Sequence, residues 1–218
     1  MDKIYGAYLS PFVRKVVLTF ELKGIPFEMI SAVPGMFPQG YKNIHPLMKI
    51  PTLQNEELTL PDSSVICQYL DDKYPDKKVI PAERVLKAKT LWLEEYADTK
   101  VIEVTGANLF FERFMKPLLG KTPDEEKITR NLETEMPKVL EYLEERCGDY
   151  PGIYMVGNSI TVADFAIMGM FLNARYVGFE VDAAHFPKFR KYLEDMFAVP
   201  LIAARIKAEE RFLKPRAK

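Results

Sequence analysis

The sequence predicts two domains, an α+β domain followed by an all-helical one. Its 218 residues suit two compact domains better than one small one. Over the first third of the chain, the hydrophobic pattern gives the element order β-α-β-β-β-α. A polar, proline-bounded stretch follows, and after it only helical patterns occur. We therefore expect a first domain at residues 1–75, a linker at 76–83 and a helical bundle domain at 84–218.

The first helix has clear start and end signals. Ser10 can cap its N-terminus, and Pro11 suits the first helical position because no N–H is needed there. Gly24 ends the helix near Lys23, since glycine readily adopts the left-handed conformation of a C-cap. Four strand patterns belong to the same domain, at residues 3–9, 26–30, 52–54 and 57–60.

Two helices of the second domain have recognisable entry signals. Thr122 begins a Thr-x-x-Glu capping box with proline at the next position. Thr161 and Asp164 form a second capping box, in which aspartate replaces glutamate, and Ile160 and Phe165 are spaced as a hydrophobic staple. We expect these residues to be structural. Helical patterns cover residues 84–114, 123–146, the segment after 161, 186–197 and 200–212.

Composition argues against several kinds of function. Thirty basic and 31 acidic side chains give a net charge of -1, which does not suit binding to nucleic acid or to an anionic membrane. The two cysteines form no CxxC pair, and the two histidines lie in no metal-binding pattern. No secretory signal is visible, and the most apolar stretch, residues 160–172, is too short to span a membrane. We expect a cytoplasmic protein without a metal or a tightly bound cofactor.

Four motifs together resemble those of the soluble glutathione transferase superfamily. They are SPFVRKV at 10–16, KIPTL at 49–53, DSSVICQYL at 62–70 and TVADF at 161–165. The strand and helix order, with an Ile-Pro step opening the third strand, is similar to the thioredoxin fold. The resemblance covers nearly the whole chain. It implies a thioredoxin-like glutathione-binding domain, followed by an all-α helical bundle domain that carries a pocket for the electrophile.

The resemblance assigns the catalytic role to Ser10. In serine-type classes, a serine at this helix start assists the sulfur of glutathione. A thiol with a pKa of about 8.5 is mostly protonated at neutral pH, and a hydroxyl donor beside the positive end of a helix would stabilise the thiolate. Ser10 could instead only cap its helix. Because this position is not cysteine, disulfide exchange here is excluded. Tyr8 remains an alternative, as in tyrosine-type classes.

The resemblance also implies a set of glutathione-binding residues. A cis bond between Ile50 and Pro51 would present backbone groups to the cysteinyl part of glutathione. Asp62 and Ser63 would hold the γ-glutamyl end, with the serine and the helix amides binding its carboxylate and the acid holding its ammonium group. Lys49 would pair with the glycyl carboxylate. The alternatives are a trans proline, an aspartate that only caps its helix, and a solvated lysine.

Aromatic residues are the candidates for the electrophile pocket. Phe110, Phe111 and Phe114 lie in the long helix that faces the sulfur in this family, within one turn, so they cannot all point the same way. For any one of them, packing in the bundle core is the alternative. Phe12, beside the glutathione motifs, is a further candidate. We expect Arg14 to form a surface or interdomain ion pair.

The function implied by the resemblance is that of a serine-type glutathione transferase. Such an enzyme adds the glutathione thiolate to hydrophobic electrophiles in detoxification, with glutathione as a co-substrate, and some members also reduce organic hydroperoxides. The alternatives are a non-catalytic binding or regulatory module of the same family, and a specialised glutathione-dependent isomerase or dehalogenase. The family further implies a symmetric homodimer.

Overall fold

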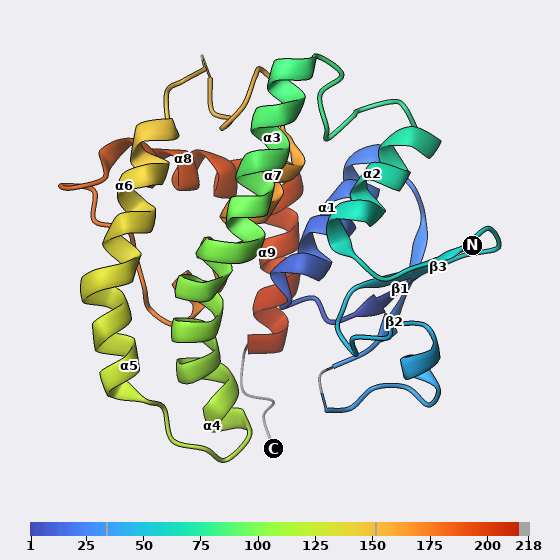
Figure 1. Cartoon of the computed structure of the whole chain (residues 1–218), viewed down its shortest axis with the longest axis horizontal. Helices are drawn as coiled ribbons and strands as arrows, with labels where there is room; N and C mark the ends of the chain where they lie inside the picture. The colour runs from blue at the N-terminus through green and yellow to red at the C-terminus, as the bar shows by residue number, and fades with distance from the viewer. Residues whose placement is uncertain (34, 151, 214–218) are drawn as a thin grey trace. The chain divides into compact units, whose positions relative to one another are not determined.

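The computed structural model describes residues 1–33, 35–150 and 152–213 (Figure 1). It contains two compact units, one formed by Met1–Ile80 together with the chain from Val199 onward, the other by Pro81–Ala198. The sequence suggested that the helical domain continues to the C-terminus. In the structure, the last helix, α9 (Pro200–Leu213), groups instead with the first unit.

The first unit is built on a four-stranded mixed sheet with the strand order β2-β1-β3-β4. β1 pairs parallel with β2 and antiparallel with β3, and β3 pairs antiparallel with β4. This confirms the predicted thioredoxin-like fold. β1 is shorter than expected because the chain turns at Ala7, whose carbonyl accepts the Ser10 N–H at 3.0 Å. The strands are β1 (Asp2–Gly6), β2 (Phe27–Ser31), β3 (Thr52–Gln54) and β4 (Thr59–Leu60).

Two helices, α1 (Pro11–Lys23) and α2 (Ser63–Lys73), lie side by side next to the sheet (Figure 1). Between them, Thr19 Oγ1 and Cys67 Sγ lie 3.4 Å apart, and both residues are fully buried. β1 approaches α1 so closely at Gly6 that a Cβ there would lie 2.6 Å from Val13 Cγ2. The absence of a side chain at Gly6 therefore allows β1 and α1 to pack closely together.

Helix α9 is joined to α1 by an ion pair that is fully buried. Arg14 Nε and Nη2 donate to the Glu209 carboxylate at 2.8 and 2.6 Å. The sequence leads us to expect a surface or interdomain ion pair for Arg14. The pair is not at the surface, and Glu209 belongs to the residues that the sequence assigns to the second domain, although both residues lie in the first compact unit of the structure. Such bidentate geometry holds two helices in one relative position, since any sliding would leave buried charges unpaired.

The second unit consists of helices. Its central element is α7 (Val162–Tyr176), which packs against α3 (Arg84–Tyr96), η3 (Glu103–Met115) and α8 (Pro187–Ala198). Every residue from Val162 to Ala174 is buried. That explains why its sequence is apolar on all sides. No helix within the described ranges is long and apolar enough to cross a lipid bilayer. The predicted helix at 84–114 comprises α3 (Arg84–Tyr96) and the π-helical η2 (Ala97–Val101) and η3 (Glu103–Met115), followed by α4 (Lys116–Leu118). The others are α5 (Glu125–Arg130), the π-helical η4 (Asn131–Glu135), α6 (Met136–Arg146), α7 (Val162–Tyr176) and α8 (Pro187–Ala198).

One of the two predicted capping boxes is confirmed. At the start of α7, the Thr161 N–H and hydroxyl both donate to Asp164 Oδ2 at 2.8 Å. The prediction for Thr122 is wrong, because α5 begins later and Asp124 caps it, accepting the Lys127 N–H at 3.0 Å. The Asp124 N–H in turn donates to the buried carboxylate of Glu112 at 3.0 Å, which fixes the chain just before the helix.

Candidate functional site

The predicted motifs of the first unit meet at one end of the sheet. β1 ends at Gly6, and antiparallel pairing places the start of β3 beside this end. β4 runs antiparallel to β3, so its last residue, Leu60, lies at the same end. α1 follows β1, α2 follows β4, and the Ile50-Pro51 step precedes β3. The register therefore brings together the N-termini of both helices and the Ile50-Pro51 step.

Ser10 stands at the N-terminus of α1. Its backbone is extended, and its Oγ accepts the Val13 N–H at 3.4 Å, a long contact. Pro11 occupies the first turn, which contains no acidic side chain to neutralise the positive end of the helix dipole. Because the Val13 contact uses the oxygen as an acceptor, the hydroxyl hydrogen remains able to donate to an anion.

Tyr8, the alternative to Ser10, packs against α9. Its ring stacks with that of Phe212 at 5.9 Å between centroids, and the Arg205 guanidinium lies 4.7 Å from the centre of the Tyr8 ring. Arg205 is itself ion-paired with Glu21 on α1. These contacts give the tyrosine ring a packing role in the first unit.

The peptide bond between Ile50 and Pro51 is cis, as predicted. The adjoining chain is held by Tyr41, a residue that the sequence analysis missed. The Tyr41 hydroxyl donates to the Lys49 carbonyl at 2.6 Å and lies 2.9 Å from Thr52 Oγ1. Burial raises the pKa of Tyr41, so the phenol remains a neutral donor. It thus connects the residues on either side of the Ile50-Pro51 step.

His45 shapes the loop that carries the Lys49 side chain. Its Nδ1 accepts the Leu47 N–H at 3.2 Å, and the ring is buried. Burial is the main cause that lowers the pKa of His45, and the nearby Lys49 lowers it further. The imidazole is therefore neutral at pH 7, as its acceptor role requires. The side chain of Lys49 itself is exposed.

The N-terminus of α2 is capped as predicted. Asp62 Oδ1 accepts the N–H groups of Ser64 and Val65 at 2.9 and 3.0 Å. Ser63, the first residue of the helix, is 5% exposed, and neither its N–H nor its hydroxyl has a hydrogen-bonding partner among the described residues. A helix N-terminus with an open N–H and hydroxyl is suited to binding a carboxylate.

Lys15 links the starts of the two helices. Its side chain is fully buried, and its Nζ donates to Ser64 Oγ at 3.2 Å. The same ammonium lies 6.0 Å from the centre of the Phe12 ring. Lys15 and Ser64 were not singled out from the sequence, because nothing in the spacing of residues 49 positions apart shows that they meet.

Two of the phenylalanines expected at the electrophile pocket are in contact with each other. Phe110 is buried and stacks with Phe114, with 4.9 Å between ring centroids. Phe111 is 42% exposed, so it points elsewhere. Phe12 belongs to the first unit and is half-buried. The structure therefore favours Phe110 and Phe114 as a pair and separates Phe111 from them.

Cysteine chemistry is disfavoured in this protein. Cys67 and Cys147 are both free and buried. Burial raises the pKa of Cys147 to about 12, so it stays protonated at neutral pH and is a poor nucleophile. Within the described ranges, no three His, Cys, Asp or Glu side chains come close enough to hold a metal ion.

Family comparison agrees with the geometry in both halves of the chain. The family described as glutathione S-transferase, N-terminal domain, matches residues 4–78. The glutathione S-transferase, C-terminal domain, matches residues 110–209. The chain belongs to the glutathione S-transferase superfamily.

Individual relatives of this superfamily member extend over most of the chain. Glutathione S-transferase omega-1 of Mus musculus is 26% identical over 204 residues, covering 93% of this chain and 79% of the mouse protein. A probable maleylacetoacetate isomerase of Vibrio cholerae is 29% identical over 210 residues, covering 92% and 93%. The solved structure of a glutathione S-transferase from Sinorhizobium meliloti superposes with a TM-score of 0.84 at 20% identity, covering 100% of this chain and 96% of that one, which supports the fold.

Proposed function

We propose that this protein is a serine-type glutathione transferase. The observation that carries the proposal is the position of Ser10: its hydroxyl stands at the positive end of a 13-residue helix, at the same end of the sheet as the Ile50-Pro51 step and the start of α2. Donation from this hydroxyl to the sulfur of bound glutathione would stabilise the thiolate. Each unit of pKa lowering corresponds to about 1.4 kcal/mol.

The same end of the sheet offers partners for the other parts of glutathione. The Ser63 N–H and hydroxyl would bind the γ-glutamyl carboxylate, and the Asp62 carboxylate would hold the adjacent ammonium group. The backbone of Ile50, before Pro51, would pair with the cysteinyl part in the manner of an added strand. Lys49, whose ammonium is exposed, would meet the glycyl carboxylate.

In the proposed reaction, the thiol of bound glutathione loses its proton to solvent. The thiolate attacks an electrophilic carbon, a C–S bond forms, and the leaving group departs with the bonding electron pair. Phe12, in the first turn of α1, would supply an apolar contact to the electrophile, and the family resemblance assigns the same role to Phe110 and Phe114. Detoxification of reactive small molecules, and reduction of organic hydroperoxides at the expense of glutathione, would follow from the same thiolate.

Steady-state kinetics with a halonitroarene can separate the proposed roles. Ser10→Ala should lower kcat by about tenfold or more and change the glutathione KM only a few-fold, because the lost interaction is stronger in the reactive state. Ser63→Ala should mainly raise the glutathione KM. Ser159→Ala, at an exposed serine of the second unit, is the matched control and should behave as wild type. Wild-type kinetics in both Ser10→Ala and Ser63→Ala would refute the proposal.

A glutathione-dependent isomerase is a second candidate, favoured by the similarity to the Vibrio cholerae protein over nearly the full length of both chains. The same thiolate would add to a conjugated double bond, permit rotation, and leave again, so that glutathione is regenerated. Product analysis distinguishes the two reactions: a transferase consumes glutathione and yields a conjugate, whereas an isomerase returns all of it.

We also propose a symmetric homodimer, the commonest assembly among homo-oligomers and the one that the family suggests. Sedimentation at several protein concentrations should show a dimer. A monomer at all concentrations would contradict this.

A further inference from the structure

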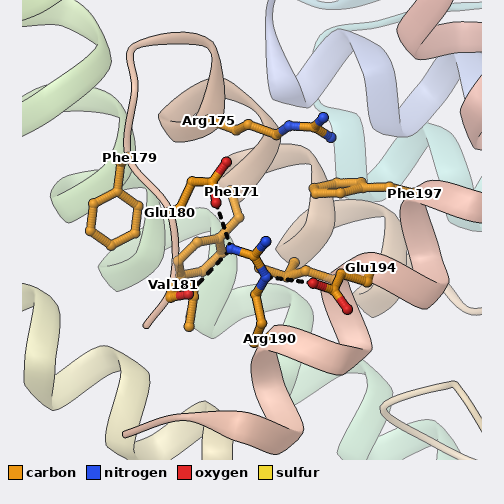
Figure 2. Close-up of a pocket in the computed structure, with 9 residues that line it drawn as sticks. Phe171, Arg175, Phe179, Glu180, Val181, Arg190, Glu194 and Phe197 are labelled. Carbon is orange, nitrogen blue, oxygen red and sulfur yellow. Dashed lines mark hydrogen bonds and ion pairs between the residues drawn. The ribbon is translucent and has the colours of Figure 1, made fainter. Parts of the chain in front are cut away.

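The helical unit contains a cavity of its own, of about 240 Å³ (Figure 2). It lies between the end of α7, the segment 177–186 and α8. Its apolar wall includes Phe171, Val181 and Leu193, which are 2%, 4% and 5% exposed. The cavity is smaller than the sites that usually hold drug-sized ligands, and it suits a molecule with a single ring.

One of the two arginines that line this cavity is held by two glutamates. Arg190 Nη1 lies 2.8 Å from Glu180 Oε2, and Arg190 Nε lies 2.7 Å from Glu194 Oε1. Nη1 also donates to the Val181 carbonyl at 3.3 Å. The hydrogen bond from Arg190 lowers the pKa of Glu180, which is therefore ionised at neutral pH. Arg190, on α8, thus holds segment 177–186 against that helix and stabilises the wall of the cavity.

The second arginine, Arg175, is held differently. Its guanidinium lies over the ring of Phe197, 5.3 Å from the centroid, and it forms no hydrogen bond or ion pair with any described residue. Figure 2 shows this stacked pair on one side of the cavity and the Arg190 cluster on the other. Stacking uses the face of a guanidinium and leaves its N–H edge open, and this edge matches a carboxylate.

The charges around the cavity restrict what it can bind. Arg190 is shared by two glutamates, so this cluster carries a surplus negative charge. Arg175 also contributes to lowering the pKa of Glu180, but its guanidinium forms no ion pair with a described residue. A ligand with one anionic group can place it at Arg175. A second anionic group at the far end of the ligand would meet Glu180 and Glu194 and be repelled.

We propose that this cavity binds a small aromatic monocarboxylate. Its ring packs against Phe171 and Leu193, and its carboxylate accepts two N–H bonds from Arg175 in a bidentate pair. The site is separate in its residues from the proposed glutathione site, because all of its residues belong to the helical unit. It therefore does not depend on Ser10 or on the transferase reaction.

NMR titration of the full chain, labelled with ¹⁵N, tests the proposal with benzoate as the probe. Saturable shifts are expected for the amides of residues 177–181 and for Arg175 Nε–H, with a Kd of about 1 mM or tighter, given the size of the probe. Arg175→Gln should raise the Kd by about tenfold or more, because a charge-assisted pair is lost. Terephthalate, a dianion of the same width, should bind more weakly than benzoate.

Two control variants show whether benzoate binds specifically in this cavity. Arg130→Gln removes an exposed arginine elsewhere in the helical unit and should leave the benzoate Kd unchanged. Ser63→Ala should also leave it unchanged, which excludes binding at the proposed glutathione site. The Arg175 side chain makes no hydrogen bond with a described residue, so its replacement should not unfold the chain. The absence of saturable shifts at 177–181, an unchanged Kd in Arg175→Gln, or tighter binding of terephthalate would each overturn the proposal.

Discussion

Replacement of Asp164 by alanine should destabilise the helical unit by far more than the loss of an ordinary helix cap. The Asp164 carboxylate is fully buried and accepts four hydrogen bonds. Two come from the N–H and hydroxyl of Thr161, each at 2.8 Å, one from the Met155 N–H at 2.9 Å, and one from the Tyr192 hydroxyl at 3.1 Å. Asp164 therefore connects the chain before α7, the start of α7, and α8.

The magnitude follows from the donors that alanine leaves behind. The two backbone N–H groups cannot turn away, and each unsatisfied buried donor costs about 1–3 kcal/mol. The two hydroxyl groups can rotate toward other acceptors, so their loss contributes less. We expect a total of roughly 4 kcal/mol in the free energy of unfolding.

Urea unfolding at pH 7 measures this effect, and Asp124→Ala provides the matched control. Asp124 also caps a helix, but it is exposed and accepts only one N–H bond in that role, so its loss should cost about 1 kcal/mol. Tyr192→Phe should be destabilising in the wild-type background and close to neutral in Asp164→Ala, because its partner has already gone. Equal losses for the two aspartates, or strictly additive effects with Tyr192→Phe, would show that the four hydrogen bonds of Asp164 do not carry this stability.

Asp164 should also give the protein a distinctive pH dependence. Burial raises the pKa of Asp164 to about 6, against the four donors that lower it. Its folded-state pKa is thus above its unfolded value, so the folded state binds more protons between about pH 4 and 6. The associated stability is present at low pH and is lost as pH rises through 6. When the pH is lowered from 7 to 5, the free energy of unfolding of the wild type should therefore rise by about 1 kcal/mol relative to that of Asp164→Ala. A pH-independent difference would contradict this assignment.

Three further predictions concern the first unit. Arg14→Met should cost about 3–5 kcal/mol in urea unfolding because the buried Glu209 carboxylate loses its bidentate partner, and adding Glu209→Leu should recover most of the loss; a double variant no better than the single one would count against this. Tyr41→Phe should lower the free energy of unfolding by about 1–2 kcal/mol and raise the glutathione KM more than it changes kcat, because the hydroxyl holds the chain beside the Ile50-Pro51 step. An unchanged KM would show that Tyr41 does not support the glutathione site. Gly6→Ala should cost about 1–3 kcal/mol because its Cβ would collide with Val13; an unshifted urea midpoint would show that α1 can move aside.

The sequence predicts best what is decided locally. Capping by Ser10, Asp62 and Asp164 depends on residues within three positions of each other, so the pattern of residue types is sufficient. The prediction for Thr122 failed because Thr122 and Asp124 are both residue types that can cap this helix. The choice of Asp124 depends on a hydrogen bond from its backbone N–H to Glu112, 12 residues away.

Pairings between distant residues could not be found in this way. Arg14 and Glu209 are 195 positions apart, and either charge alone resembles a surface residue. Tyr41 lies in an irregular segment without periodicity, so only the folded chain shows that its hydroxyl supports the Ile50-Pro51 step. The stacked Arg175 and Phe197 likewise come from two different helices. Each of these contacts depends on tertiary packing, which a single sequence does not record.

Ultraviolet absorbance of the glutathione thiolate in the binary complex, followed against pH, is the sharpest test of the role proposed for Ser10. We expect a thiol pKa in the wild-type complex below that of free glutathione, and a rise of about one unit or more in Ser10→Ala, while Tyr8→Phe remains at the wild-type value. A shift in Tyr8→Phe alone would move the role to the tyrosine. A thiol pKa equal to that of free glutathione, in a wild-type protein that binds glutathione tightly, would exclude activation by Ser10 and favour a binding module.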